Sequence, residues 1–306
     1  MIIIKDIVIL LVSIIVIGKG AVWLVDAAAR VAKHFGISEL VIGLTVVAFG
    51  TSAPEFGVTI LAAIRGMGDI SVANIVGSNI FNLGFILGGT AIIHSLKTSR
   101  TIVFRDGFFL LFGGILLSVF LWDLTLSKIE GIVLFTLLVL YLLYLYFKKE
   151  TIETEEPTHA MYRWDPILLF VGIGLVIVGS HFLVESAVSI ARFMGVSDWV
   201  IGATIIAAGT SAPEFATSLT AAMKSRYGMS VGNLIGSDIF NLFGVLGVAG
   251  MMRNLSVGHD VQINLIILSF MIAVVLIFMR TGWVVSRKEG IILVMIGLLR
   301  WIYSFS

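Results

Sequence analysis

The seven-residue segment Gly-Thr-Ser-Ala-Pro-Glu-Phe occurs twice, at residues 50–56 and 209–215, each time within an otherwise apolar stretch. Proline lacks an N–H group and its ring crowds the carbonyl four residues earlier, so Pro54 must loosen a helix near Gly50. Inside a membrane the freed carbonyls are tolerated only where protein, water or an ion satisfies them. A glutamate at membrane depth is also energetically expensive, so each copy indicates a functional site. The carbonyl, hydroxyl and carboxylate oxygens of the segment suit Ca2+, Na+ or Mg2+ rather than soft metals.

The composition indicates a polytopic membrane protein. Of the 306 residues 58% are hydrophobic and 13% are charged, and the mean hydropathy is +1.08, whereas soluble proteins carry about 25% charged residues. The chain has no cysteine, which excludes disulfides and thiolate metal sites, and its five histidines form no close pair, which removes zinc hydrolase motifs. A net charge of +1 without a basic patch predicts no nucleic-acid partner.

Ten apolar segments reach the length of about 20 residues that a transmembrane helix needs. The first continues beyond the length of a signal-peptide core, and no small-residue cleavage site follows it, so it is predicted to be a span. We therefore predict an all-α membrane protein with ten transmembrane helices. The predicted spans are residues 6–33, 38–64, 70–94, 102–121, 128–147, 165–192, 197–223, 229–252, 260–279 and 286–303.

The two halves of the chain are related by a constant offset of 159 residues, which is the difference between positions 214 and 55. The same offset relates Asn74 to Asn233, Gly77 to Gly236, Ser78 to Ser237 and Asn82 to Asn241. Five spans per half is an odd number, so the second half must enter the membrane upside down. We predict two inverted-topology five-helix repeats, 1–147 and 165–306, joined by a linker at 148–164. Substrate sites in such folds lie near the membrane midplane at the repeat interface.

The loop charges predict the orientation in the membrane. Of the lysines and arginines, thirteen fall on one of the two faces that ten spans imply and six on the other, with Lys19 inside a span. Cytoplasmic loops carry the excess of positive charge, so the richer face is predicted to be cytoplasmic. We expect a multi-pass protein of the cell membrane with both termini extracellular and the 148–164 linker cytoplasmic.

Polar side chains form a stripe on each helix that carries or follows the repeated segment. Thr51 and Ser52 precede Glu55 by four and three residues and therefore share its face. On the next helix the polar residues recur at every fourth position, and they and their repeat mates are Asn74, Ser78, Asn82, Asn233, Ser237 and Asn241. Such residues often only hydrogen-bond a neighbouring helix, and we favour that interpretation for Asn74 and Asn233.

The two glutamates need a countercharge. No lysine or arginine lies near mid-depth on the helices that carry the polar stripes. A bound cation or a proton is therefore the best source of the positive charge that Glu55 and Glu214 lack. Asp238 lies about 100° around its helix from Ser237, so we do not place it in this site, and a role at the edge of the cavity is the alternative.

The two Gly-Thr-Ser-Ala-Pro-Glu segments, each followed by Gly-Ser-x-Ile-Phe-Asn at 77–82 and 236–241, resemble the paired alpha-repeats of the sodium/calcium exchanger family, within the cation/calcium antiporter superfamily. The resemblance covers the cores of the second, third, seventh and eighth spans closely and the ten-span layout as a whole. It implies that these four helices pack centrally, while the first and sixth are long, tilted and mobile. Proton-coupled relatives usually carry a Gly-Asn-Ala-x-Glu type of segment instead, so the segment here favours sodium.

The resemblance also implies the ion ligands. Glu55 and Glu214 match the carboxylates that bridge Ca2+ and neighbouring Na+ sites. The other matching positions are Thr51 and Thr210 for Ca2+, Ser52, Ser78, Ser211, Ser237, Ala48 and Ala207 for Na+, and Asn82 and Asn241 for the middle site. Some relatives, including potassium-dependent ones, carry Asp at the position of Asn241, so the Asn here argues against potassium dependence.

We predict an antiporter that exchanges Na+ for Ca2+ by alternating access, and the resemblance implies three Na+ per Ca2+ and hence electrogenic transport. Ca2+ and Na+ are its expected substrates and the lipid bilayer its surroundings; we expect no cofactor and function as a monomer. The alternative is a Ca2+/H+ antiporter of the same superfamily, in which the two glutamates titrate, and a cation channel is a further alternative. No nucleophile–base pair or catalytic aspartate pair supports an intramembrane enzyme.

Three charged residues lie inside spans without an assigned role. Lys19 and Asp26 lie seven residues apart on one face of the first span, and Glu185 is the repeat mate of Asp26. We favour pairing with neighbours or with water for these charges, and a gating contact on a sliding helix is the alternative.

Overall fold

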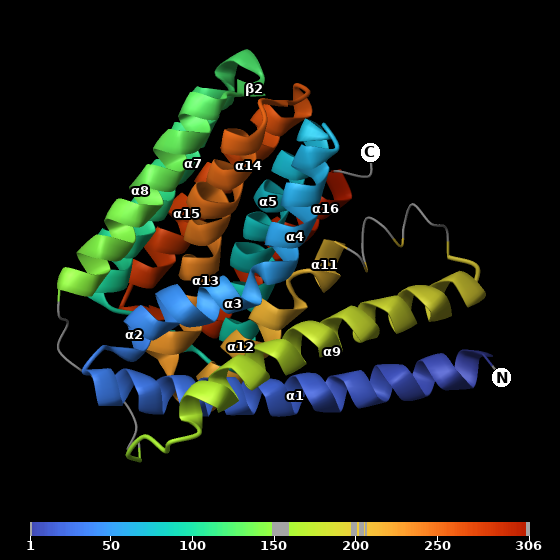
Figure 1. Ribbon diagram of the computed structural model, residues 1–306, viewed down its shortest axis with the longest axis vertical. Helices are drawn as coiled ribbons and strands as arrows, with labels where there is room; N and C mark the ends of the chain where they lie inside the picture. Colours follow the sequence, from blue (N-terminus) through green and yellow to red (C-terminus); the bar gives the residue numbers. More distant parts are fainter. Residues whose placement is uncertain (1, 149–158, 197–200, 202–204, 206, 304–306) are drawn as a thin grey trace.

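The computed structural model describes residues 2–148, 159–196, 201, 205 and 207–303, and these residues are almost entirely helical (Figure 1). The first half contains α1 (Ile2–Phe35), α2 (Glu39–Ile42), η1 (Gly43–Val47), α3 (Ala48–Thr51), α4 (Ala53–Ile64), α5 (Gly68–Phe81), η2 (Asn82–Leu87), α6 (Gly88–Ile93), β1 (Leu96–Lys97), η3 (Ile102–Gly107), α7 (Phe108–Phe120), η4 (Leu121–Asp123), β2 (Thr125–Leu126) and α8 (Lys128–Phe147). The second half contains α9 (Asp165–Phe193), α11 (Ala207–Gly209), α12 (Ala212–Met223), α13 (Tyr227–Ile239), η6 (Phe240–Val245), α14 (Leu246–Met252), β3 (Leu255–Ser256), α15 (Asp260–Arg280), β4 (Val284–Val285) and α16 (Arg287–Tyr303).

Most of the predicted spans correspond to long apolar helices. In the described part of the chain, 7 helices are long and apolar enough to cross a membrane, and a bent pair raises this number to 8. They are Ile4–Phe35, Gly68–Ile93, Ile102–Asp123, Lys128–Phe147, Asp165–Phe193, Tyr227–Met252 and Asp260–Arg280, with Glu39–Thr51 and Ala53–Ile64 as the bent pair. The predicted tenth span is α16, with 17 residues, and the predicted seventh span falls partly outside the described residues. The chain is therefore an all-α membrane protein, as predicted.

Two short strand ladders show how the halves are related. β1 pairs with β4, so that Leu96 faces Val285, and β2 pairs with β3, so that Leu126 faces Leu255. The offset of 159 residues carries β1 onto β3 and β2 onto β4, because 255 − 96 and 284 − 125 both equal 159. A two-fold operation therefore exchanges the two ladders. Since β1 and β2 stand at opposite ends of η3 and α7, the ladders lie on opposite faces, as inverted repeats require.

The helices α1 and α9 pack against each other through small residues. Figure 1 shows them side by side along the bottom of the view, where they cross the more upright helices. A Cβ atom on Gly20 would lie 2.8 Å from Cβ of Leu175, and one on Gly172 would lie 2.7 Å from the backbone nitrogen of Leu24. The missing side chains allow the two backbones to approach closely, which is a common way for membrane helices to associate.

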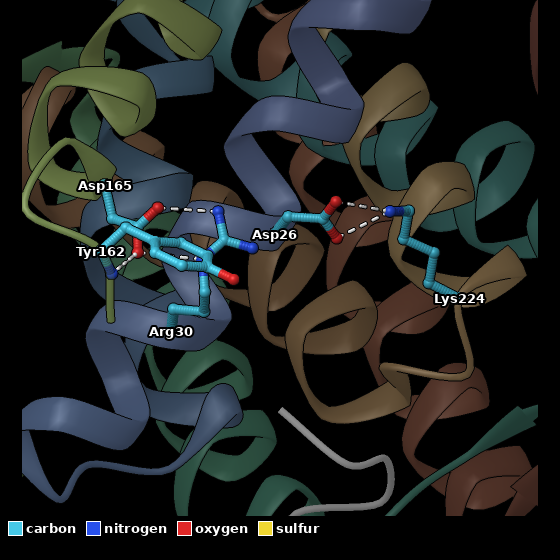
Figure 2. Close-up of polar contacts among 5 residues, drawn as sticks. All are labelled: Asp26, Arg30, Tyr162, Asp165 and Lys224. Atoms are coloured by element: carbon cyan, nitrogen blue, oxygen red, sulfur yellow. Dashed lines mark hydrogen bonds and ion pairs between the residues drawn. The ribbon is translucent and has the colours of Figure 1, made fainter. Parts of the chain in front are cut away.

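One ion pair joins α1 to α9 near one end of the helix pair, and another joins α1 to the end of α12 (Figure 2). Arg30 of α1 donates to both carboxylate oxygens of Asp165 of α9 at 2.9 and 2.7 Å, and its guanidinium lies 5.3 Å from the ring centre of Tyr162. Lys224, at the end of α12, donates to both oxygens of Asp26 at 2.6 and 2.8 Å. The favoured interpretation of Asp26 as a paired charge is thus confirmed.

The other two unassigned charges behave differently. Lys19 is exposed on α1. Glu185, the repeat mate of Asp26, is 69% exposed and lies 3.9 Å from the imidazole of His181. The pseudo-symmetry of the repeats therefore does not extend to these ion pairs. Among the described residues, Asp26 of α1 forms an ion pair with Lys224 at the end of α12, and its repeat mate on α9 forms no equivalent pair.

The close contact of α1 and α9 predicts the effect of a single methyl group. Gly172→Ala should lower the free energy of unfolding by about 1–3 kcal/mol, because the backbone of α1 leaves no room for the new Cβ. Gly174→Ala is the matched control on the same helix, since nothing lies within 4 Å of a Cβ at that position. Alanine is the better helix former by about 1 kcal/mol, so the control should be no less stable than the wild type. Thermal unfolding of the purified variants in detergent measures both, and equal melting temperatures would contradict the packing described.

Candidate ion-binding site

The repeated segment breaks the helix in which it lies. α3 ends at Thr51 and α4 begins at Ala53, with a bend of 51° between the two parts of the span. Pro54 stands in the first turn of α4, where its missing N–H group disturbs no helical hydrogen bond. In the second copy α11 ends at Gly209 and α12 begins at Ala212. The helix break predicted from proline is therefore confirmed in the first copy, and an equivalent interruption separates α11 from α12.

The two glutamates are completely buried and are held by the opposite repeat. Ser52 Oγ donates to Glu214 Oε1 at 3.1 Å, and Ser211 Oγ donates to Glu55 Oε1 at 3.1 Å. Each serine therefore binds the carboxylate of the other copy. None of the ion pairs found among the described residues involves either glutamate.

Four of the buried oxygen atoms without a hydrogen-bond partner within the described structure belong to predicted ligands. They are Oε2 of Glu55, Oε2 of Glu214, Oδ1 of Asn82 and Oδ1 of Asn241. Leaving such a group unsatisfied costs about 1–3 kcal/mol, and more for a charged group. All four atoms are acceptors of the hard oxygen type that Ca2+ and Na+ prefer. The two asparagines lie in π-helical turns, η2 and η6, a geometry that is frequent at functional sites.

The hydroxyl of Thr51, itself a predicted ligand, contacts two further predicted ligands, Ser237 and Ala48. Its Oγ1 lies 3.4 Å from Ser237 Oγ and donates to Asn233 Oδ1 at 3.2 Å. The carbonyl of Ala48 accepts from the backbone N–H of Ser52 at 3.0 Å and lies 3.3 Å from the Thr51 hydroxyl. The hydroxyls and carbonyls of the first copy therefore converge on the helix break.

Three predicted ligands remain, and they are Ser78, Thr210 and Ala207. Ser78 is buried and lines a cavity between α5 and α16 together with Asn74 and Arg300, and no hydrogen bond between described residues joins it to the glutamates. Thr210 is half-buried between α11 and α12. Ala207 is the first residue of α11, and its side chain lies outside the described part of the structure.

Asn74 and Asn233 hold neighbouring helices together. Asn74 Nδ2 donates to Thr59 Oγ1 at 2.9 Å, and Asn233 Nδ2 donates to Ser218 Oγ at 2.9 Å. These are equivalent contacts in the two repeats, since 218 − 59 is also 159. The favoured interpretation of these two residues as helix-to-helix contacts is confirmed.

Two buried residues that the sequence reasoning did not place in the site touch it directly. Asn82 Nδ2 donates to Asp238 Oδ1 at 2.9 Å, and Asn241 Nδ2 donates to Asn79 Oδ1 at 2.9 Å. A signal was present in the sequence, because Asn79 and Asp238 are repeat mates, each three residues before a predicted ligand. The angle of about 100° between Asp238 and Ser237 gives the side of the helix on which Asp238 lies. It does not reveal that a helix of the other repeat packs on that side.

Two inverted repeats that meet at broken helices and buried carboxylates define an inverted-repeat membrane transporter. The family described as sodium/calcium exchanger protein matches residues 5–147 and 164–301, and this chain belongs to that family. It is a family of transporters and not of enzymes.

Several relatives match over nearly the whole chain. The sodium/calcium exchanger MaX1 of Methanosarcina acetivorans is 31% identical over 94% of this chain and 95% of its own length. The inner membrane protein YrbG of Escherichia coli is 33% identical over 79% of this chain and 78% of its own length. Among solved structures, the sodium-calcium exchanger NCX_Mj soaked with zero Na+ and Ca2+ matches with a TM-score of 0.87 and 32% identity, covering 99% of this chain and 100% of that chain. The fold that the resemblance implied is thereby confirmed.

Proposed function

We propose that this protein exchanges Na+ for Ca2+ across the cell membrane by alternating access. The observation that carries the proposal is that two buried glutamates, each hydrogen-bonded by a serine of the other repeat, and two buried asparagines each keep an unpartnered acceptor oxygen. The proposed ligands are Ala48, Thr51, Ser52, Glu55, Ser78, Asn82, Ala207, Thr210, Ser211, Glu214, Ser237 and Asn241. The relatives MaX1 and NCX_Mj, which are called sodium/calcium exchangers, support this choice of ions.

Electrostatics explains how exchange becomes obligatory in this proposal. One Ca2+ balances the two negative charges of Glu55 and Glu214, and Na+ ions distributed over the carboxylates and the surrounding hydroxyls do the same. An empty site keeps two uncompensated charges at membrane depth, which costs several kcal/mol and opposes the conformational change. Only the loaded carrier then crosses between its two states.

The two long helices supply the moving part of the proposed cycle. α1 and α9 touch through glycines and are joined by the pair of Arg30 with Asp165, which supports their movement as one unit. A further ion pair within the described part of the chain, Asp26 with Lys224, ties this unit to α12 (Figure 2). This pair is about one-third exposed, and exposed pairs contribute about 1 kcal/mol or less, so it opposes sliding only weakly.

The alternative is Ca2+/H+ exchange. Two buried carboxylates are sufficient to exchange one Ca2+ for two protons, and such a reaction is electroneutral. The hydroxyls of Ser52, Ser78, Ser211 and Ser237 have no place in that reaction, whereas monovalent cations need them as ligands. This surplus of oxygen ligands favours sodium, and a channel is disfavoured by the two inverted halves closed around one carboxylate pair.

Replacing either glutamate should abolish Ca2+ transport. Glu55→Gln and Glu214→Gln each remove half of the ligand charge, and the affinity for Ca2+ depends on the number of carboxylates. Uptake of Ca2+ into proteoliposomes under an outward Na+ gradient measures the effect. Glu185→Gln is the matched control, since this glutamate lies exposed on α9. Normal Ca2+ uptake in either site variant would exclude the proposed site.

Transport should be driven by sodium and should respond to voltage. Exchange of three Na+ for one Ca2+ moves one net charge, which is worth about 2.3 kcal/mol per 100 mV and shifts the Ca2+ gradient by more than tenfold. Clamping the proteoliposome potential with valinomycin and K+ should therefore change the Na+-dependent Ca2+ flux. A flux that ignores both voltage and Na+ but follows a pH gradient would establish the proton-coupled alternative instead.

We further propose that the protein lies in the cell membrane as two repeats, 1–147 and 165–306, with linker 148–164 in the cytoplasm and both termini outside. Contacts group the loop charges on two faces. One face holds the ion pairs of Figure 2 and the pair of Arg226 with Glu39. The other holds the contact of the Lys128 backbone N–H with Asn254 Oδ1 at 3.1 Å. The first face carries the larger positive charge, which supports a cytoplasmic location.

The absence of native cysteine allows a direct test of this orientation. A cysteine introduced at Ser306 in intact cells should react with a membrane-impermeant maleimide from outside. A cysteine introduced at Thr151, in the linker, should react only after the membrane is permeabilised. The reverse pattern would show that the protein is inserted the other way.

A further inference from the structure

Four buried side chains form two equivalent hydrogen bonds behind the proposed site. Asn82 donates through Nδ2 to Asp238 Oδ1, and Asn241 donates through Nδ2 to Asn79 Oδ1, both at 2.9 Å. All four residues are at most 1% exposed. In each case the residue that accepts belongs to one repeat and the residue that donates belongs to the other. The Oδ1 atoms of the two donors are two of the four unpartnered oxygens of the predicted ligands.

The end of an asparagine side chain that faces the site decides whether the side chain can bind a cation. A carboxamide has an oxygen, which binds cations, and an NH2 group, which repels them. The two ends have nearly the same shape, so packing alone does not select between them. Only hydrogen-bond partners of fixed character distinguish the oxygen from the nitrogen.

Such partners are present on both sides. The backbone carbonyl of Asp238 only accepts, so Asn79 must offer it Nδ2, at 3.0 Å, and this leaves Asn79 Oδ1 directed at Asn241. Asn241 must in turn offer Nδ2, and its own Oδ1 is left for the site. On the other side the side chain of Asp238 ends in two oxygens, so Asn82 offers Nδ2 to it and keeps Oδ1 free.

We propose that Asn79 and Asp238 are positioning residues that determine which end of Asn82 and Asn241 faces the transported ions. The inference rests on the proposed function, in which these two amide oxygens are cation ligands. The repeat mates act by different means, because an aspartate presents an oxygen whichever way it turns, whereas Asn79 must itself be oriented by a backbone carbonyl. Polar partners behind metal ligands commonly change metal affinity by about 10–100-fold when they are removed.

The first experiment measures the half-saturating concentrations of Ca2+ and Na+ in proteoliposomes for Asp238→Leu, which has no acceptor. We expect about a tenfold rise for Ca2+ as Asn82 loses its fixed orientation. Asp238→Asn is the conservative variant, since an amide in the equivalent place of the first repeat, Asn79, already acts as an acceptor. It should recover most of the lost affinity. If it is as impaired as Asp238→Leu, the negative charge matters rather than the orientation, and the inference is wrong.

A double-mutant cycle separates positioning from a merely structural role. If Asp238 acts through Asn82, then Asp238→Leu should cause no further loss of Ca2+ affinity in an Asn82→Leu background. Additive losses would overturn the inference. Thermal unfolding of each variant in detergent shows that the compared proteins are folded. If Asp238→Leu does not fold, Asn79→Leu with Asn241→Leu gives the same cycle in the other repeat.

The outcomes distinguish this inference from the proposed function. If Asn82→Leu alone leaves the affinity for Ca2+ unchanged, Asn82 is not a ligand, and both its assignment and the positioning role are wrong. If Asn82→Leu impairs Ca2+ binding while Asp238→Leu and Asn79→Leu do not, the ligand assignment stands and the positioning role is overturned. Loss of affinity in the single variants without additivity in the cycle supports the inference.

Discussion

Neither half of this protein completes the site by itself, because each buried glutamate depends on a serine of the other half. Ser52 holds Glu214 and Ser211 holds Glu55, both through bonds of 3.1 Å between residues that are about half the chain apart. Two carboxylates without a basic partner are tolerable at membrane depth only if something neutralises them when the protein works. The inverted repeat is the arrangement that brings the two carboxylates together, and so the fold and the proposed requirement for a cation share one cause.

The hydrogen bonds between opposite repeats can form because the backbones of the two repeats approach closely. A Cβ on Gly43 would lie 2.8 Å from the carbonyl oxygen of Met229, and one on Gly236 would lie 2.6 Å from that of Leu44. Small residues thus press the broken span of the first repeat against α13 of the second. The short hydroxyl of Thr51 can then reach Ser237 across the interface. Away from this core, α1 and α9 meet through their own glycines, and α1 packs against the core through a buried apolar cluster that includes Leu24, Ile42 and Ala221.

Local sequence determined the helices, the repeats and the central residues. Long apolar runs predict spans because the bilayer demands a minimum length, and a proline predicts a helix break because its ring has no N–H group to offer. The offset of 159 residues identified equivalent positions without any knowledge of contacts, and the odd number of predicted spans in each half implied inversion. The polar pairs of Asn74 with Thr59 and Asn233 with Ser218 follow the same rule.

The tertiary structure alone decided what each polar group touches across the interface. Periodicity states on which side of its own helix a residue lies, but it does not state which helix stands there. The sequence therefore places Asp238 on a different side of its helix from Ser237, but it does not show that Asp238 contacts Asn82, 156 residues away. The same limit applies to Asp26, whose partner Lys224 is 198 residues distant. These partners arise from the two-fold packing of whole repeats, and that packing depends on the sum of many helix contacts rather than on any single segment.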